Sequence, residues 1–352
     1  MSGMIGMEPR PRVAITMGDA AGIGPEIIVR SLADPVAATW AVPVVLGDAR
    51  VLERAMDVAG VRLSLRRISR PGEAEGRPGT LDVVDYANID LAAHRWGEVR
   101  ASNGAAAVHY TREAGRFALA GDVDAMVSAP LNKEAMHAAG YPYEGQTEIL
   151  GELTGSRPAM VMVVDRMRVM LFTNHMALRA VCDYVRKDRV LDRLVLADAA
   201  LRDMGIARPR LVVAGLNPHA GESGAFGREE QEEIVPAIAA ARERGIDAEG
   251  PFPADTVFLK ARDGVYDLTL ALYHDQGLMA VKLVGFGRVV TLLIGIPLIR
   301  TSTGHGTAFD IAGRNLADHK NLLEAIRVAA EVARGTRGSP ERGLAAAYGR
   351  AA

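Results

Sequence analysis

The chain has 352 residues, of which 49% are hydrophobic and 24% charged, and its formal net charge is −2. This length and composition are typical of a soluble globular protein with two domains or lobes. The near-neutral charge and the 5% aromatic content argue against a broad nucleic-acid surface, a polybasic membrane anchor and a stacking platform for single-stranded nucleic acid. The single cysteine, Cys182, excludes an internal disulfide, fits a reducing cytoplasmic compartment, and is expected to be a small buried residue.

Short β-rich runs alternate with helical patterns along the chain, which predicts an α/β fold with mostly parallel strands. The predicted strands are residues 13–17, 43–47, 125–129, 211–216, 268–273 and 289–294. The predicted helices are residues 25–32, 49–59, 102–119, 132–139, 228–244, 276–284, 318–334 and 340–348. Residues 160–172 are two β-rich runs around a polar turn, which predicts a hairpin and therefore a mixed sheet.

Three histidines, His175, His219 and His274, each follow the end of a predicted strand. Such loop mouths are where α/β proteins place ligand and catalytic groups. Three imidazoles with one open position can hold a catalytic divalent metal, although any one histidine alone is more often structural. Asp255, in a proline-flanked loop, is a candidate fourth ligand or base, and Asp275 could orient the imidazole of His274.

Two segments in the first half of the chain allow both a functional and a structural interpretation. Residues 18–26 lie between a strand and a helix, where backbone N–H groups could face an anion. They depart from the dinucleotide-binding fingerprint, so a structural turn is equally compatible. Gln146 and Thr147 suit recognition of hydroxyl or carboxylate groups, and they equally suit a helix cap.

The densest cluster of candidate residues runs from Arg300 to Gly313. Arg300 with the hydroxyls and glycine N–H groups that follow it predicts a phosphate or carboxylate clamp. The small residues around His305 imply a close approach of the backbone to a ligand. Lys282 follows His274 by eight residues on one predicted helix, so both could face the same cleft.

Six motifs together resemble the 4-hydroxythreonine-4-phosphate dehydrogenase family of vitamin B6 biosynthesis. They are Thr16–Asp19 with Gly22–Glu26, Ala129–Lys133, Leu216–Glu222, Gly250–Thr256, Tyr273–Gly277 and Gly304–Thr307. The resemblance implies a two-domain fold like that of isocitrate and isopropylmalate dehydrogenases. Residues 1–130 and 290–352 would form a discontinuous first domain, and residues 131–289 a second domain with the metal ligands and the dimer interface. It also implies a homodimer whose active site lies at the subunit interface.

The resemblance further implies oxidation of a hydroxyl β to a carboxylate by NAD or NADP, followed by decarboxylation. Zinc, magnesium or cobalt would be the metal, and the substrate a small anion. The candidates from both arguments are the metal ligands His175, His219 and His274; the catalytic residues Lys282 and Asp255; the substrate contacts Gln146, Thr147, Lys282, Thr291 and Arg300; and the cofactor contacts Gly304, His305, Gly306 and Asp310.

Two substitutions distinguish this chain from the usual family pattern. Gln146 stands where the family usually has histidine, and Thr291 where it usually has asparagine; both positions contact substrate there. 4-Hydroxythreonine 4-phosphate is the leading expected substrate. D-Threonate or D-erythronate 4-phosphate and carboxylated aromatic cis-dihydrodiols, which sibling enzymes use, are the alternatives. A phosphate acyltransferase-like enzyme is the alternative of another class, against which the three histidines and residues 304–313 argue.

Overall fold

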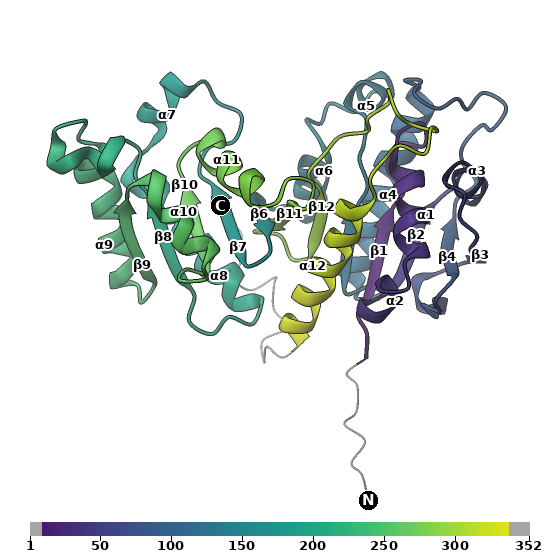
Figure 1. Ribbon diagram of the computed structural model, residues 1–352, viewed down its shortest axis with the longest axis horizontal. Coiled ribbons are helices and arrows are strands. Elements are labelled where there is room, and N and C mark those ends of the chain that lie inside the picture. The colour runs from purple at the N-terminus through teal and green to yellow at the C-terminus, as the bar shows by residue number, and fades with distance from the viewer. Residues whose placement is uncertain (1–8, 338–352) are drawn as a thin grey trace, which may run out of the picture. The chain divides into compact units, whose positions relative to one another are not determined.

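The computed structural model describes residues 9–337 and divides them into two compact α/β units (Figure 1). Unit 1 contains the described residues up to Leu153 together with Leu298–Arg334, and unit 2 contains Thr154–Pro297 and the residues from Gly335. The helix predicted at residues 340–348 lies outside the described residues.

The chain therefore passes from one unit to the other after residues 153 and 297, whereas the predicted domain boundaries followed residues 130 and 289. Packing explains the first difference, because Met136 and Ile149 share a buried cluster with Val108 of unit 1. Hydrogen bonding explains the second, because residues 290–294 pair with a strand of unit 2.

All the strand pairs of unit 1 are parallel, in the order β3-β4-β2-β1-β5-β12. The strands are β1 (Arg12–Thr16), β2 (Val42–Gly47), β3 (Ser64–Ile68), β4 (Thr80–Asp85), β5 (Ala125–Ser128) and β12 (Arg300–Thr303). The central strands are buried almost throughout, which explains their near-continuous apolar runs.

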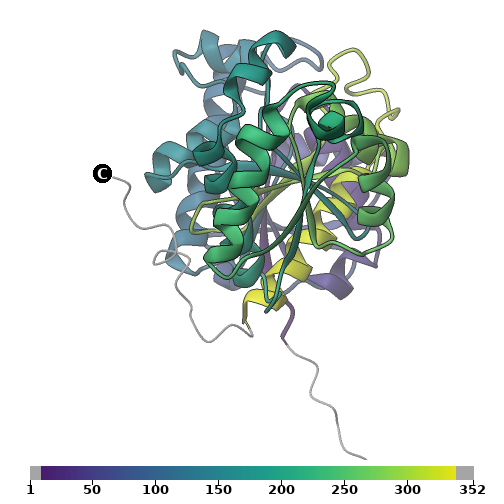
Figure 2. The same ribbon diagram turned by 90° about the vertical axis from the view of Figure 1, so that its left-hand side faces the viewer.

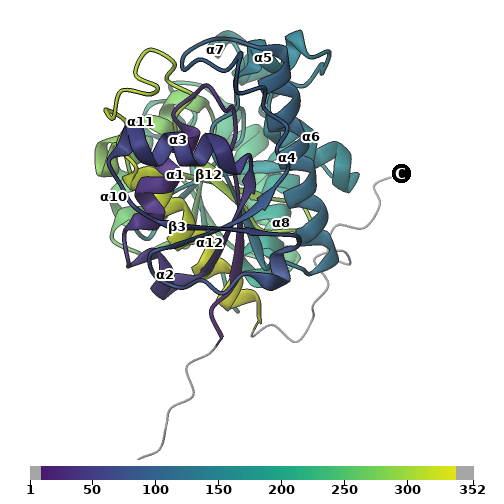
Figure 3. The same cartoon turned by 90° about the vertical axis from the view of Figure 1, so that its right-hand side faces the viewer.

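The helices of unit 1 cover both faces of these strands. They are α1 (Gly24–Ala33), α2 (Ala37–Trp40), α3 (Ala49–Ala59), α4 (Ala101–Ala120), α5 (Lys133–Ala138), α6 (Gln146–Thr154) and α12 (Lys320–Arg337), with a short 3₁₀ turn at Pro71–Glu73. Figure 3 shows α1 and α3 on one side of the strands and α4 with α6 on the other. Local signals fix α3, since the Asp48 side chain accepts from the Arg50 N–H at its start and Gly60 ends it in the left-handed region.

Unit 2 has a mixed sheet in the order β11-β6-β7-β10-β8-β9. The strands are β6 (Ala159–Val164), β7 (Met167–Leu171), β8 (Arg210–Ala214), β9 (Asp247–Phe252), β10 (Leu268–Ala271) and β11 (Val290–Ile294). β6 is antiparallel to β7 and β11, so the predicted hairpin is confirmed. β7, β10, β8 and β9 are parallel to one another. The predicted α/β fold with a mixed, mostly parallel sheet is therefore confirmed.

The helices of unit 2 are α7 (Leu178–Tyr184), α8 (Lys187–Asp203), α9 (Val235–Glu243), α10 (Ala254–Arg262) and α11 (His274–Gly285), with irregular turns η2 (Pro218–Gly224) and η3 (Glu230–Ile234). Figure 2 looks onto this unit and shows α8 and α9 on one side of the strands and α11 on the other. Val281 anchors α11 in a buried cluster with residues of β6, β7 and β10.

Two sequence expectations in unit 2 are wrong. Cys182 is exposed, because α7 buries the neighbouring Val181 instead. Asp255 lies in the first turn of α10 and not in a loop, since the proline-flanked loop ends at Pro253. None of the helices within residues 9–337 is long and apolar enough to cross a membrane.

Candidate functional site

The three candidate histidines follow three adjacent parallel strands of unit 2. β10 lies between β7 and β8, with Ala271 opposite Leu171 and Leu270 opposite Val213. The carboxyl ends of the strands are therefore nearly level. His175 follows β7, His274 follows β10 and His219 follows β8. This is the edge of an α/β sheet at which ligands usually bind.

Two side chains tie these strand ends together. Thr173 Oγ1 donates to the Leu272 carbonyl oxygen at 2.8 Å, which links β7 to β10. Gln276 accepts from the Leu272 N–H at 2.7 Å and donates through Nε2 to the Gly215 carbonyl oxygen at 2.8 Å, which links β10 to β8. Both side chains satisfy backbone groups where the strands end. The starts of the three histidine loops are thus linked to one another by side-chain hydrogen bonds.

His175 and His274 lie side by side, with ring centroids 5.5 Å apart. His274 Nδ1 is 2.7 Å from Asp275 Oδ1, so the predicted contact between these two residues is confirmed. A carboxylate on Nδ1 leaves Nε2 as the free nitrogen. Both histidines line a cavity of about 260 Å³ that also includes Asn174, Tyr273 and Asp275.

His219 lies on a loop with unusual backbone geometry. Residues 219–224 all have positive φ, including 53° at His219 and 40° at Glu222. Non-glycine residues pay about 1–2 kcal/mol each for this conformation, and strain of this kind that persists often marks a functional segment. Within residues 9–337 no three histidine, cysteine or acidic side chains are grouped closely enough to hold a metal. Two of the predicted ligands are therefore together, and the three-histidine site stays a prediction.

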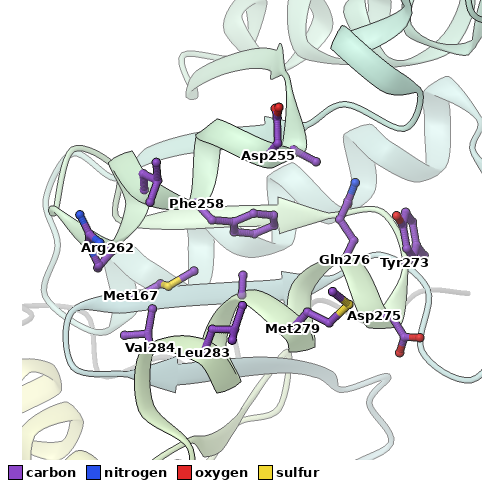
Figure 4. Close-up of a pocket in the computed structure, with 13 residues that line it drawn as sticks. Met167, Asp255, Phe258, Arg262, Tyr273, Asp275, Gln276, Met279, Leu283 and Val284 are labelled. Carbon is purple, nitrogen blue, oxygen red and sulfur yellow. The ribbon is translucent and has the colours of Figure 1, made fainter.

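A larger cavity of about 710 Å³ lies beside α10 and α11 and shares Tyr273 and Asp275 with the histidine cavity. Figure 4 shows Asp255 among its lining residues, with the apolar side chains Met279 and Leu283 from α11. Lys282 is exposed in the last part of α11, about two turns from His274, and does not line either cavity described here.

Arg300 is a deeply buried cation in unit 1, at the start of β12. It is 4% exposed, and its Nε donates to Ser128 Oγ at 3.1 Å. Burial lowers the pKa of Arg300 to about 10, against the opposing effect of the negative charge of Glu148. The guanidinium stays charged at neutral pH while its hydrogen-bond partner is a neutral hydroxyl. Such a group favours binding of an anion.

Gln146 begins α6, and protein atoms already engage its amide. Nε2 donates to the Ala129 carbonyl oxygen at 3.0 Å, and Oε1 lies 3.3 Å from Thr111 Oγ1. Thr147 is half-buried in the same helical turn. Thr291 is 8% exposed, and its hydroxyl faces Met162 Sδ at 3.7 Å. The hydroxyl of Thr291 thus contacts the interior of unit 2, and its predicted role as a substrate contact stays untested.

The predicted cofactor loop of unit 1 has several exposed residues and is supported by a backbone hydrogen bond. Gly304, His305, Gly306 and Asp310 are exposed, and a Cβ at Gly306 would meet nothing within 4 Å. The Ile23 N–H donates to the Thr307 carbonyl oxygen at 3.0 Å, so the first glycine segment supports this loop. Residues 17–24 are all buried, which favours the structural interpretation of that segment.

The predicted site residues did not include the side chains that support them, namely Thr173 and Gln276 at the histidine strands and Ser128 beside Arg300. Gln276 lies within the motif Tyr273–Gly277, so its place beside His274 was visible in the sequence. The others gave no such signal, because their importance depends on which strands are neighbours.

Comparisons with known proteins extend over nearly the whole chain. Residues 39–329 match the family described as Pyridoxal phosphate biosynthetic protein PdxA. The D-threonate 4-phosphate dehydrogenase of Cupriavidus necator is 45% identical over 325 residues, which are 92% of this chain and 97% of that protein. The 4-hydroxythreonine-4-phosphate dehydrogenase structure from Klebsiella pneumoniae has a TM-score of 0.86 and 44% identity, covering 92% of this chain and 99% of that one. The terephthalate 1,2-cis-dihydrodiol dehydrogenase from Burkholderia xenovorans has a TM-score of 0.64 and 34% identity, covering 92% and 98%.

Proposed function

This chain belongs to the Pyridoxal phosphate biosynthetic protein PdxA family, and we propose that it oxidises a phosphorylated 3-hydroxy acid. NAD or NADP would accept the hydride, a divalent metal would assist, and the β-keto acid formed would lose carbon dioxide. The family and the dehydrogenase names of its relatives support this reaction class.

The observation that carries the metal proposal is the placement of the three histidines after three adjacent parallel strands. Imidazole nitrogens suit zinc or cobalt better than magnesium, which prefers oxygen ligands. When bound, the metal would polarise the substrate oxygen during oxidation and decarboxylation. Asp275 would keep His274 in the tautomer whose Nε2 is free to bind the ion.

The remaining candidates have complementary roles in this proposal. Arg300 would bind one anionic end of the substrate, because its charge is buried and its Nε donates to a neutral hydroxyl. Lys282 would bind another anionic group, and Asp255 would accept the proton of the hydroxyl. The exposed residues Gly304 and Gly306 would let a dinucleotide approach the backbone closely.

Among such acids we place D-threonate 4-phosphate first and 4-hydroxythreonine 4-phosphate second. The two differ at C2, where the first has a hydroxyl and the second an ammonium group. Gln146 Nε2 uses one N–H on Ala129 and has a second to offer. A substrate hydroxyl can accept that hydrogen bond, and an ammonium group cannot. The 45% identical relative from Cupriavidus necator is named for the first substrate, and the 44% identical structure from Klebsiella pneumoniae for the second.

A homodimer is part of the proposal, with the α11 surface as its interface. Leu283 and Phe286 are 86% and 85% exposed, and Met279 is 63% exposed. Apolar residues gathered beside a cavity are typical of an association surface. A second copy placed there would lie next to Tyr273 and Asp275, and therefore next to the histidine cavity.

The reaction can be tested by absorbance at 340 nm with the three phosphorylated acids (D-threonate, D-erythronate and 4-hydroxythreonine 4-phosphates) and a carboxylated cis-dihydrodiol. We expect reduction of NAD or NADP with D-threonate 4-phosphate, loss of activity with a chelator, and recovery with Zn²⁺ or Co²⁺. Turnover that a chelator leaves unchanged would contradict the metal proposal. A clear preference for 4-hydroxythreonine 4-phosphate would reverse the substrate order.

A further inference from the structure

Glu230 is a buried acidic residue that has no place in the reaction described above. We infer that it is the positioning residue for His219, because its carboxylate holds the left-handed loop from which His219 would reach the metal. This inference rests on the metal-dependent function proposed for the three histidines.

Glu230 is 2% exposed, and its carboxylate accepts three hydrogen bonds. Oε1 accepts from the backbone N–H groups of Leu216 and Asn217 at 2.8 and 2.7 Å. Oε2 accepts from Asn217 Nδ2 at 2.9 Å. All three donors belong to the two residues that precede Pro218 and His219, so the carboxylate fixes the point at which the loop leaves β8.

Glu230 also contacts the middle of the loop. A Cβ at Gly221 would lie 2.8 Å from Glu230 Oε2, so the loop closes directly over the carboxylate. The second N–H of Asn217 Nδ2 donates to Glu229 Oε2 at 2.8 Å, which uses both amide hydrogens of that side chain. The backbone of residues 216–221 is therefore hydrogen-bonded to Glu230 at its start and packed against the same carboxylate at Gly221.

The position of Glu230 connects this loop to a rigid part of unit 2. It is the first residue of the π-helical turn Glu230–Ile234, whose last residue is buried and which leads directly into α9. Single π turns occur frequently at functional sites. A left-handed loop with several non-glycine residues persists only when its surroundings determine it, and the Glu230 carboxylate is the buried group that bonds to its entry.

The test uses Glu230→Ala and Glu230→Gln in the full chain. Glu230→Ala removes both acceptor oxygens and so all three hydrogen bonds, whereas Glu230→Gln keeps Oε1 and turns an amide nitrogen towards Asn217. Glu232→Ala is the matched control, because Glu232 is an exposed acid of the same turn and pairs with Arg228 at 2.6 Å. The readouts are Co²⁺ affinity by calorimetry and amide hydrogen exchange at Leu216 and Asn217 in metal-free protein.

We expect Glu230→Ala to weaken Co²⁺ binding about 10- to 100-fold, as loss of a group that orients a metal ligand usually does, and to speed exchange at both amides. Glu232→Ala should match wild type in both. If Glu230→Ala does not fold, the same two measurements on Glu230→Gln decide the question, and we expect that variant to lose less Co²⁺ affinity. A folded variant with wild-type Co²⁺ affinity or wild-type exchange overturns the positioning role alone. Wild-type protein that binds no Co²⁺ overturns the proposed metal function and the positioning role together.

Discussion

The loop that follows β1 in unit 1 and the histidine loops of unit 2 are held in different ways. In unit 1 the loop that follows β1 is held by backbone contacts: the Asp19 N–H donates to the Pro130 carbonyl oxygen at 2.9 Å, and a Cβ at Gly18 would lie 2.2 Å from the same oxygen. In unit 2 side chains do this work, through Thr173, Gln276 and Glu230.

The difference indicates which substitutions each unit tolerates. Where main chains touch directly, the sequence must keep side chains out, so glycine positions are critical. Where one buried side chain ties two loops, the sequence must keep that hydrogen-bonding group, and its loss leaves backbone groups unpaired. We therefore expect substitutions in the loops of unit 1 to destabilise the fold first, and substitutions in the loops of unit 2 to weaken ligand binding first.

The largest effect is expected for Gly18→Ala in unit 1. Gly18 has φ of 70°, and the added Cβ would collide with backbone atoms. Left-handed strain and overpacking together predict a loss of about 3–5 kcal/mol in the free energy of unfolding. Chemical denaturation should measure it, with Gly306→Ala as control, because that Cβ meets nothing within 4 Å. Equal stability of the two variants would remove the basis for the comparison.

The next largest effect concerns the pH dependence of unit 1 through Asp19. Burial raises the pKa of Asp19 to about 6, partly opposed by the hydrogen bond from the Ala21 N–H. The folded state therefore favours the protonated carboxyl. The stability that this gives is complete below about pH 4 and is lost as pH rises through 6.

Asp19→Asn should remove this dependence. Relative to wild type, the variant should gain about 3 kcal/mol in the free energy of unfolding between pH 4 and pH 8. Paired denaturation curves at the two pH values measure the gain. A stability difference that is the same at both would show that Asp19 does not titrate between them.

Arg300 is an exception within unit 1, because it is a side chain on which we expect substrate binding to depend. Loss of a charge-assisted contact to an anion costs about 1.5–3 kcal/mol, or roughly 10- to 150-fold in affinity. Arg300→Ala should therefore raise KM for a phosphorylated substrate by that factor. Steady-state kinetics would show an error in the assignment if KM for the nucleotide rose instead.

The fold was predictable wherever local patterns decide structure. The helix predicted at residues 49–59 has the observed bounds, and the strand at 289–294 differs from β11 by one residue. β3 was missed because its Arg66 and Arg67 break the apolar pattern. They form ion pairs with Asp82 and Asp85 of β4, and such pairing depends on strand order.

The site was predictable as a set of residue types but not as a structure. Histidines after strands and the contact of His274 with Asp275 follow from short-range sequence features. The left-handed loop at His219 does not, because its backbone conformation opposes ordinary residue preferences. Its support by Glu230, eleven residues later in the chain, depends on tertiary packing.

The smallest effect is expected for Gln276→Leu in unit 2. The change keeps the volume but removes the link between β10 and β8, and so leaves the Leu272 N–H and the Gly215 carbonyl without this partner. We expect a loss of about 1 kcal/mol in the free energy of unfolding, with a clear fall in Co²⁺ affinity because the His219 loop starts at Gly215. Thr173→Val is the matched variant, since it removes a side-chain hydrogen bond between the ends of β7 and β10 and should leave the His219 loop in place. Denaturation and calorimetry on both variants measure the two effects. If Gln276→Leu lowered stability by several kcal/mol with unchanged Co²⁺ affinity, unit 2 would resemble unit 1, and the difference between the two kinds of loop support would not hold.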